Sequence, residues 1–214
     1  MKKIKVMLVD DHAVVRAGYK ILLKNIDTIE VVAEAANGEE SLQLSKDCNP
    51  DVIVMDISLP GMGGIEAIKR IMYDNPKAKI LVFSMHEEVV FVERAFQVGA
   101  IGYMTKSTDP EMLSKAISQV AQGKKYLDDE LKQKMTYEYE KSRDSDALLS
   151  DLSAREFQIF CLLAEGLNTN EISKQLNISY KTAANYSTQI KNKLNATTVA
   201  DIARIAIRSN IIKA

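Results

Sequence analysis

Short apolar runs alternate with amphipathic stretches along the first 123 residues. The apolar runs, each predicted to be a buried strand, are residues 4–11, 29–36, 51–57, 79–85 and 101–107. The stretches that follow them carry apolar residues at helical spacing and are predicted to be helices over 13–25, 38–48, 64–75, 89–100 and 109–123. Five strand–helix repeats are typical of a parallel sheet between two layers of helices. Because a closed barrel would need eight repeats, we predict an open, doubly wound α/β sheet.

Apolar spacing also defines a face on the first predicted helix. Val14, Ala17, Ile21 and Leu22 fall on one side of residues 13–25. The segment is therefore predicted to be amphipathic.

The composition changes after residue 124. Residues 125–147 are highly charged with few core-forming side chains, which predicts a linker that is helical in its first half. Four helices are predicted in residues 148–214, the first two opening with the capping boxes Ser153–Glu156 and Asn168–Glu171. The link 177–179 between the second and third helices has the length that a helix-turn-helix requires. We therefore expect two domains, residues 1–124 and 148–214, joined by this linker.

Charge and cysteine content narrow the possible functions. The net charge is −1, but residues 148–214 hold 8 Lys/Arg against 5 Asp/Glu, and residues 1–147 hold 20 against 24. This asymmetry favours a polyanionic partner for the second domain, although chance explains it equally well. Cys48 and Cys161 lie far apart and form neither a disulfide framework nor a metal motif. No apolar stretch is long enough to cross a membrane, so a cytoplasmic protein is expected.

Polar residues stand at or beside the ends of four predicted strands: Asp10 with Asp11, Asp56, Ser84 and Lys106. In open α/β sheets, ligands bind beyond the carboxyl ends of the strands, where these residues should converge. One strand-end aspartate is usually a turn former or a helix cap, but the full set is harder to explain in that way. Crowded carboxylates raise one another's pKa unless a cation joins them, and Mg2+ suits such an oxygen site. A carboxylate beside Mg2+ and a lysine can attack phosphorus to give an acyl phosphate.

The motifs "VDDH", "DVIVMDISLPGMGG", "FSM" and "GAIGYMTK" resemble a response-regulator receiver domain, continuously from about Lys3 to Gly123. The resemblance implies a flavodoxin-like fold with the phosphorylated aspartate at Asp56. It also implies that Mg2+ is held by Asp10, Asp11, Asp56 and the backbone carbonyl of Ser58. Ser84 and Tyr103 match the switch pair, whose hydroxyl and ring move on phosphorylation, and Lys106 matches the phosphate-binding lysine.

The segments "LSARE", "LLAEG", "NEIS", "NISYKT" and "KL" resemble the LuxR-type helix-turn-helix of NarL/FixJ response regulators. Within that family, "NEISKQLN" and Tyr186 are similar to the GacA/UvrY group. The resemblance implies that the base-facing positions are Ala184, Asn185 and Thr188. It implies that the positions near DNA phosphates are Lys181, Thr182, Gln189 and Lys193.

The proposed recognition helix departs from the family pattern in its charge. Members often carry Lys or Arg at 184 and 188, whereas residues 182–190 here contain no cation. Fewer phosphate contacts lower affinity, so weak DNA binding by the monomer and a greater role for dimerisation are expected. Tyr186 could be a core-edge residue or a phosphate donor. The apolar positions 199, 202, 203, 206 and 207 in the last helix could form a dimer contact or core.

These observations predict a transcription factor, not an enzyme, that is activated by phosphorylation of Asp56. Phosphorylation is expected to release the DNA-binding domain and to promote a homodimer. The expected partners are a sensor histidine kinase and an operator in double-stranded DNA, with no membrane. A phosphatase would need a general acid two residues after Asp56, where Ser58 stands. The remaining alternative is a protein-interaction module with weak or lost DNA reading.

Overall fold

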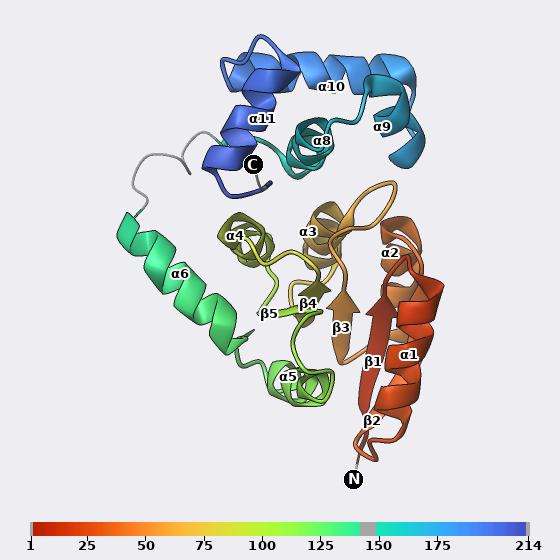
Figure 1. Cartoon of the computed structure of the whole chain (residues 1–214). Coiled ribbons are helices and arrows are strands. Elements are labelled where there is room, and N and C mark those ends of the chain that lie inside the picture. The colour runs from red at the N-terminus through yellow and green to blue at the C-terminus, as the bar shows by residue number, and fades with distance from the viewer. Residues whose placement is uncertain (1, 142–148, 213–214) are drawn as a thin grey trace. The chain divides into compact units, whose positions relative to one another are not determined.

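The computed structural model describes residues 2–141 and 149–212 and divides the chain into two compact units, Met1–Lys134 and Met135–Ala214. Figure 1 shows a sheet flanked by helices in the first unit and a group of helices in the second. Part of the expected linker, residues 142–147, lies outside the described residues, as do residues 148, 213 and 214 of the expected second domain.

The sheet of the first unit has six parallel strands in the order β2-β1-β3-β4-β5-β6. The strands are β1 Ile4–Val9, β2 Ile29–Ala35, β3 Val52–Met55, β4 Ile80–Ser84, β5 Gly102–Thr105 and β6 Tyr126–Leu127. β3 and β4 are buried along their whole length, as their continuous apolar sequences require. The predicted open, doubly wound parallel sheet is confirmed. From β1 the chain continues to β2 on one side of the sheet, whereas from β3 it continues to β4 on the other side. In parallel sheets, a ligand crevice forms at the carboxyl ends of the two strands where the connections diverge in this way.

The helices of this unit are α1 Ala13–Lys24, α2 Gly38–Cys48, α3 Gly64–Asp74, α4 Val89–Gln97 and α5 Met112–Ala121. A further helix, α6 Asp129–Lys141, begins in this unit and continues past its last residue, Lys134. Side chains of α1 and α5, including Leu23, Leu113 and Ile117, form one core cluster with the strands. α2, α3 and α4 contact one another in that order.

The structure differs from the sequence predictions at three places in this unit. β6 lies inside the segment that was expected to be linker, and it pairs with β5. α5 begins at Met112, after a turn in which Met112 N–H donates to the Asp109 carbonyl, so the predicted start at 109 was too early. Of the predicted apolar face of α1, Val14, Ala17 and Ile21 are exposed, Val14 to 86% and Ile21 to 66%, whereas Leu22 packs against the core. The side of α1 that carries Leu23 packs on the sheet. Because this helix has apolar residues on both sides, either side could have faced the sheet.

The second unit contains α8 Ala154–Ala164, α9 Thr169–Gln175, α10 Tyr180–Lys193 and α11 Val199–Arg208. Both predicted capping boxes are present, at the starts of α8 and α9. The side chains of Ile172, Leu176, Ile190 and Leu194 are buried, as expected for core positions. Each of the four helices is followed by a residue with left-handed backbone: Gly166, Asn177, Asn195 and Asn210. Such residues end helices because glycine and asparagine tolerate positive φ.

Candidate functional site

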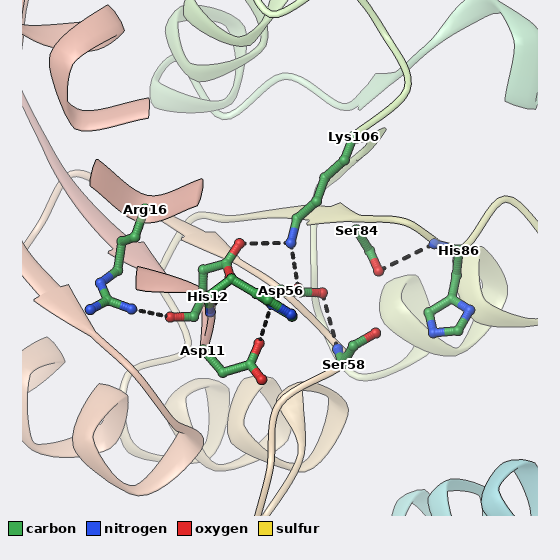
Figure 2. Close-up of polar contacts among 9 residues, drawn as sticks. Asp11, His12, Arg16, Asp56, Ser58, Ser84, His86 and Lys106 are labelled. Carbon is green, nitrogen blue, oxygen red and sulfur yellow. Dashed lines mark hydrogen bonds and ion pairs between the residues drawn. The ribbon is translucent and has the colours of Figure 1, made fainter. Parts of the chain in front are cut away.

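The ammonium group of Lys106 joins two aspartates at the carboxyl ends of the strands. Lys106 Nζ donates to Asp56 Oδ2 at 2.5 Å and to Asp10 Oδ2 at 2.6 Å, and all three side chains are at most 8% exposed (Figure 2). β1, β3 and β5 deliver these residues from positions distant in the sequence. The predicted convergence of Asp10, Asp56 and Lys106 is therefore present.

Burial and charge act in opposite directions on this lysine. Burial works against the charged ammonium of Lys106, but Asp56 and Asp10 outweigh it, so the pKa of Lys106 is raised above its ordinary value. Lys106 therefore stays positively charged at neutral pH beside the carboxylates.

Asp10, Asp11 and His12 bring ligand atoms within 4.8 Å of one another. His12 Nδ1 lies 2.9 Å from Asp11 Oδ1, and the backbone N–H of His12 donates to Asp10 Oδ1 at 2.8 Å. The carboxylates of Asp10, Asp11 and Asp56 supply the oxygen atoms that Mg2+ prefers. This donor set fits Mg2+ better than a softer metal, and the acidic cluster is typical of the magnesium site of a receiver domain.

The β3–α3 loop fixes the second oxygen of Asp56. Ser58 N–H donates to Asp56 Oδ1 at 3.0 Å, and Gly64 N–H donates to the Ile57 carbonyl at 3.2 Å. A Cβ atom at Gly64 would lie 2.1 Å from the backbone carbonyl oxygen of Asp56. Only glycine therefore fits where α3 passes so close to the Asp56 backbone.

The two residues of the predicted switch pair meet around His86. Ser84 Oγ accepts from the backbone N–H of His86 at 3.4 Å (Figure 2). The Tyr103 hydroxyl donates to the His86 carbonyl at 3.0 Å. Tyr103 is fully buried, and burial raises the pKa of its hydroxyl well above the ordinary value, with Glu88 and Asp56 adding to the effect. The ring of Tyr103 thus occupies the inward position in this structure.

Arg16 is a residue of the site that the sequence analysis missed. Its Nη1 donates to the backbone carbonyl of Asp10 at 2.5 Å (Figure 2). Its Nε lies 3.6 Å from Glu34 Oε2. The arginine thereby holds the turn that presents Asp10 and Asp11. An arginine one turn into a helix after an acidic pair was the available signal, but only the structure identifies its backbone partner.

The predicted DNA-contacting residues all lie on α10, and they differ in how far they are exposed. Lys181, Asn185, Thr188 and Gln189 are exposed, and Ala184 is half-buried. Thr182 is also half-buried, at the helix start, where its N–H donates to Ser179 Oγ. The Thr188 hydroxyl donates to the Ala184 carbonyl at 3.1 Å, so this hydroxyl is partly committed to its own helix. Tyr186 is half-buried.

Lys193 has partners within its own unit. Its Nζ donates to Glu156 Oε2 at 2.7 Å and to the Asp151 carbonyl at 3.1 Å. Glu156 is 5% exposed and also accepts from Ser153 N–H in the capping box. Burial opposes ionisation of Glu156, but the hydrogen bonds from Lys193 and Ser153 outweigh it and lower the pKa of the carboxyl. Lys193 therefore ties the end of α10 to the start of α8.

The fold and site together match known protein families. Residues 6–118 match the response regulator receiver domain, and residues 150–206 match the bacterial regulatory proteins of the luxR family. The chain belongs to the LuxR-type family of two-component response regulators, which are DNA-binding transcription regulators and not enzymes.

Individual relatives resemble the chain over its full length. It is 36% identical to the response regulator GacA of Pseudomonas aeruginosa, covering 99% of both chains. It is also 36% identical to the response regulator UvrY of Escherichia coli strain K12, covering 99% of this chain and 97% of UvrY. A solved RcsB–DNA complex is 25% identical with a TM-score of 0.61, covering 95% of this chain and 98% of RcsB.

Every helix within residues 2–141 and 149–212 is too short or too polar to span a bilayer.

Proposed function

We propose that this protein is switched by phosphorylation of Asp56, which controls how its LuxR-type domain binds DNA. The observation that carries the proposal is the buried ammonium of Lys106, held between the carboxylates of Asp56 and Asp10. An incoming phosphoryl group carries oxygens that this ammonium can bind in charge-assisted hydrogen bonds.

In the proposed step, an oxygen of Asp56 attacks the phosphorus of a phosphohistidine on a sensor kinase. A P–O bond forms as the P–N bond breaks, and the electron pair of that bond returns to the imidazole nitrogen. Ser58 N–H, which holds Asp56 Oδ1, leaves Oδ2 as the oxygen that faces Lys106. Lys106 then exchanges a carboxylate partner for a phosphoryl oxygen.

The residues that would hold Mg2+ are Asp10, Asp11, Asp56 and the backbone carbonyl of Ser58. When bound, Mg2+ supplies positive charge that stabilises the oxygens of the transferring phosphoryl group. Arg16 keeps the backbone of Asp10 in place for this role.

The exposed row on α1 supports a proposal for how the kinase docks. Val14 and Ile21 are solvent-exposed, and Ala17 and Gly18 between them are exposed too. This apolar row starts three residues after Asp11, beside the acidic pocket that a phosphohistidine must reach. An apolar helical surface on the kinase would cover the row during transfer.

On the DNA side, we propose that the exposed residues of α10 approach the major groove. Asn185 would pair with adenine, while Ala184 and Thr188 would contact a thymine methyl group. Lys181, Thr182 and Gln189 would hold phosphates. Because the middle of α10 lacks cations, a homodimer is needed for firm binding, and Val199 and Ile207, both exposed on α11, are proposed dimer contacts.

Movement of Ser84 toward the phosphoryl group is the proposed first event after transfer. Tyr103, already inward, would be held there by the rearranged β4–α4 loop. The changed receiver surface then releases the DNA-binding domain and favours the dimer.

The proposal is tested with three full-length proteins: wild type, Asp56→Ala and the control Asp27→Ala. The control alters an exposed aspartate. With acetyl phosphate and Mg2+, wild type and Asp27→Ala should gain phosphate, form dimers in light-scattering measurements and shift genomic DNA fragments in gels. Asp56→Ala should do none of these. Unchanged dimerisation of Asp56→Ala with the phosphate donor would refute the scheme. Phosphorylated dimers that bind no DNA would favour a protein-interaction module instead.

A further inference from the structure

Asp128 joins the receiver sheet to the helix that leaves it. The residue stands between β6 and α6 and is 6% exposed. Its Oδ1 accepts from Leu131 N–H at 3.1 Å, which caps the first turn of α6. Its Oδ2 accepts from the Thr105 N–H at 2.9 Å and from the Thr108 hydroxyl at 3.2 Å. One buried carboxylate thus binds two segments that are more than twenty residues apart.

The start of α6 is a fixed part of the receiver. β6 pairs with β5 through Gly102 with Tyr126 and Tyr103 with Leu127. Tyr126 belongs to the core cluster, and the side chain of Leu131 is 2% exposed. The first turn of α6 is therefore anchored on both sides of Asp128.

The segment Thr105–Thr108 is the same one that carries Lys106. Lys106 N–H donates to the Ser84 carbonyl at 2.8 Å while its ammonium reaches Asp56. The Thr105 hydroxyl is hydrogen-bonded to the hydroxyls of Ser107 and Thr108, both at 2.9 Å. The Ser107 hydroxyl donates to Glu87 Oε1 at 2.8 Å, which ties the segment to the β4–α4 loop. Four consecutive residues thus contact the phosphorylation site, the β4–α4 loop and Asp128.

We propose that Asp128 is a positioning residue that couples the Thr105–Thr108 segment to the first turn of α6. A helix cap alone needs only the bond from Leu131; the bonds from Thr105 and Thr108 add a mechanical link. If the segment moves when Lys106 takes a phosphoryl oxygen, the buried carboxylate must follow or lose a donor, which is costly. The first turn of α6 then moves as well. This inference rests on the proposed function, since it supplies the route from Asp56 toward the linker.

Amide hydrogen exchange of α6 in the full-length protein tests the coupling. Wild type, Asp128→Ala, Thr108→Val and the control Asn37→Ala are compared with and without acetyl phosphate and Mg2+, at equal phosphorylated fractions of Asp56. Asn37 caps α2 through the Glu40 N–H and has no described bond to the Thr105–Thr108 segment. A purely structural role would change α6 exchange equally in both states and leave the ratio between them unchanged.

In wild type and Asn37→Ala, phosphorylation should change the exchange of α6 amides by about fivefold or more, within the range of typical allosteric coupling. In Asp128→Ala the ratio should fall close to one, and Thr108→Val should give an intermediate ratio. A full wild-type ratio in Asp128→Ala would overturn the inference. If that variant does not fold, a full ratio in Thr108→Val would overturn it. DNA affinity of the wild type is measured in parallel, with and without phosphorylation. If phosphorylation leaves the DNA affinity unchanged while the α6 exchange ratios behave as expected, the proposed function is wrong and the coupling through Asp128 is supported.

Discussion

Replacing Lys193 with alanine should lower the free energy of unfolding of the C-terminal helical domain. It should have little effect on the salt dependence of DNA binding. The ammonium of Lys193 donates to the buried carboxylate of Glu156 and to the Asp151 carbonyl, and only 42% of the lysine side chain is exposed. A hydrogen bond to a charged group contributes about 1.5–3 kcal/mol. The free energy of unfolding of this domain should fall by about that amount, because Glu156 would stay buried without its cation.

Amide exchange in the full-length protein measures this loss within one domain. The slowest amides of α8 and α10 should exchange roughly 10- to 150-fold faster in Lys193→Ala, since about 1.4 kcal/mol corresponds to a factor of ten. Lys181→Ala is the matched control, because Lys181 is exposed near the start of α10. It should leave exchange unchanged and reduce the salt slope of DNA binding by about one unit. Unchanged exchange in Lys193→Ala, together with a salt slope lowered by about one unit, would refute the structural role of Lys193.

Three further outcomes are expected. Asn185→Ala should cost about 1–3 kcal/mol at one base position, measured by selecting bound DNA sequences, whereas a uniform loss across sequences would mean a backbone contact. Gly64→Ala should lower the free energy of unfolding by about 1–3 kcal/mol in thermal denaturation and slow phosphorylation of Asp56, because its Cβ would meet the Asp56 backbone; wild-type values for both would contradict this. Burial raises the pKa of Glu156, but its hydrogen bonds, chiefly from Lys193, outweigh burial and lower the pKa below the ordinary 4.5. The stability that this carboxylate contributes is therefore complete above 4.5 and is lost as the pH falls through the lower pKa of the folded state. The stability difference between wild type and Lys193→Ala should therefore shrink in acid, and urea unfolding at several acidic pH values would show a constant difference if this account is wrong.

The sequence was sufficient to predict the sheet and the acidic pocket because both depend on local patterns. Apolar strands and strand-end polar residues recur at each repeat, and parallel strands bring their carboxyl ends to one edge. Asp10, Asp56 and Lys106 could be placed together on that basis. The capping boxes that begin α8 and α9 were equally local and equally predictable.

Features that depend on three-dimensional partners could not be predicted. β6 has two residues, too few to show a period, and its pairing with β5 is a tertiary property. On α1, apolar residues occur on both sides, so spacing alone could not identify the side that packs on the sheet. Lys193 was predicted to lie near DNA phosphates from the family resemblance, and its bond to Glu156, 37 positions away in the chain, could not be read from spacing. Asp128, in a charged stretch, gave no sign of its bond to Thr105.

Both ends of α10 are fixed by local chemistry. Ser179 caps its start, Asn195 follows its end with φ of 51°, and the side chains of Ala183 and Ile190 are buried in the core. The helix is therefore formed before it meets DNA, and binding need not include the folding cost of about 2–5 kcal/mol that disordered DNA-binding segments incur. For this part of the interface, calorimetry should record a heat-capacity change no larger than that of docking two preformed surfaces. If α10 is the recognition helix, its few cations are partly offset, because none of the binding free energy is needed to order the helix.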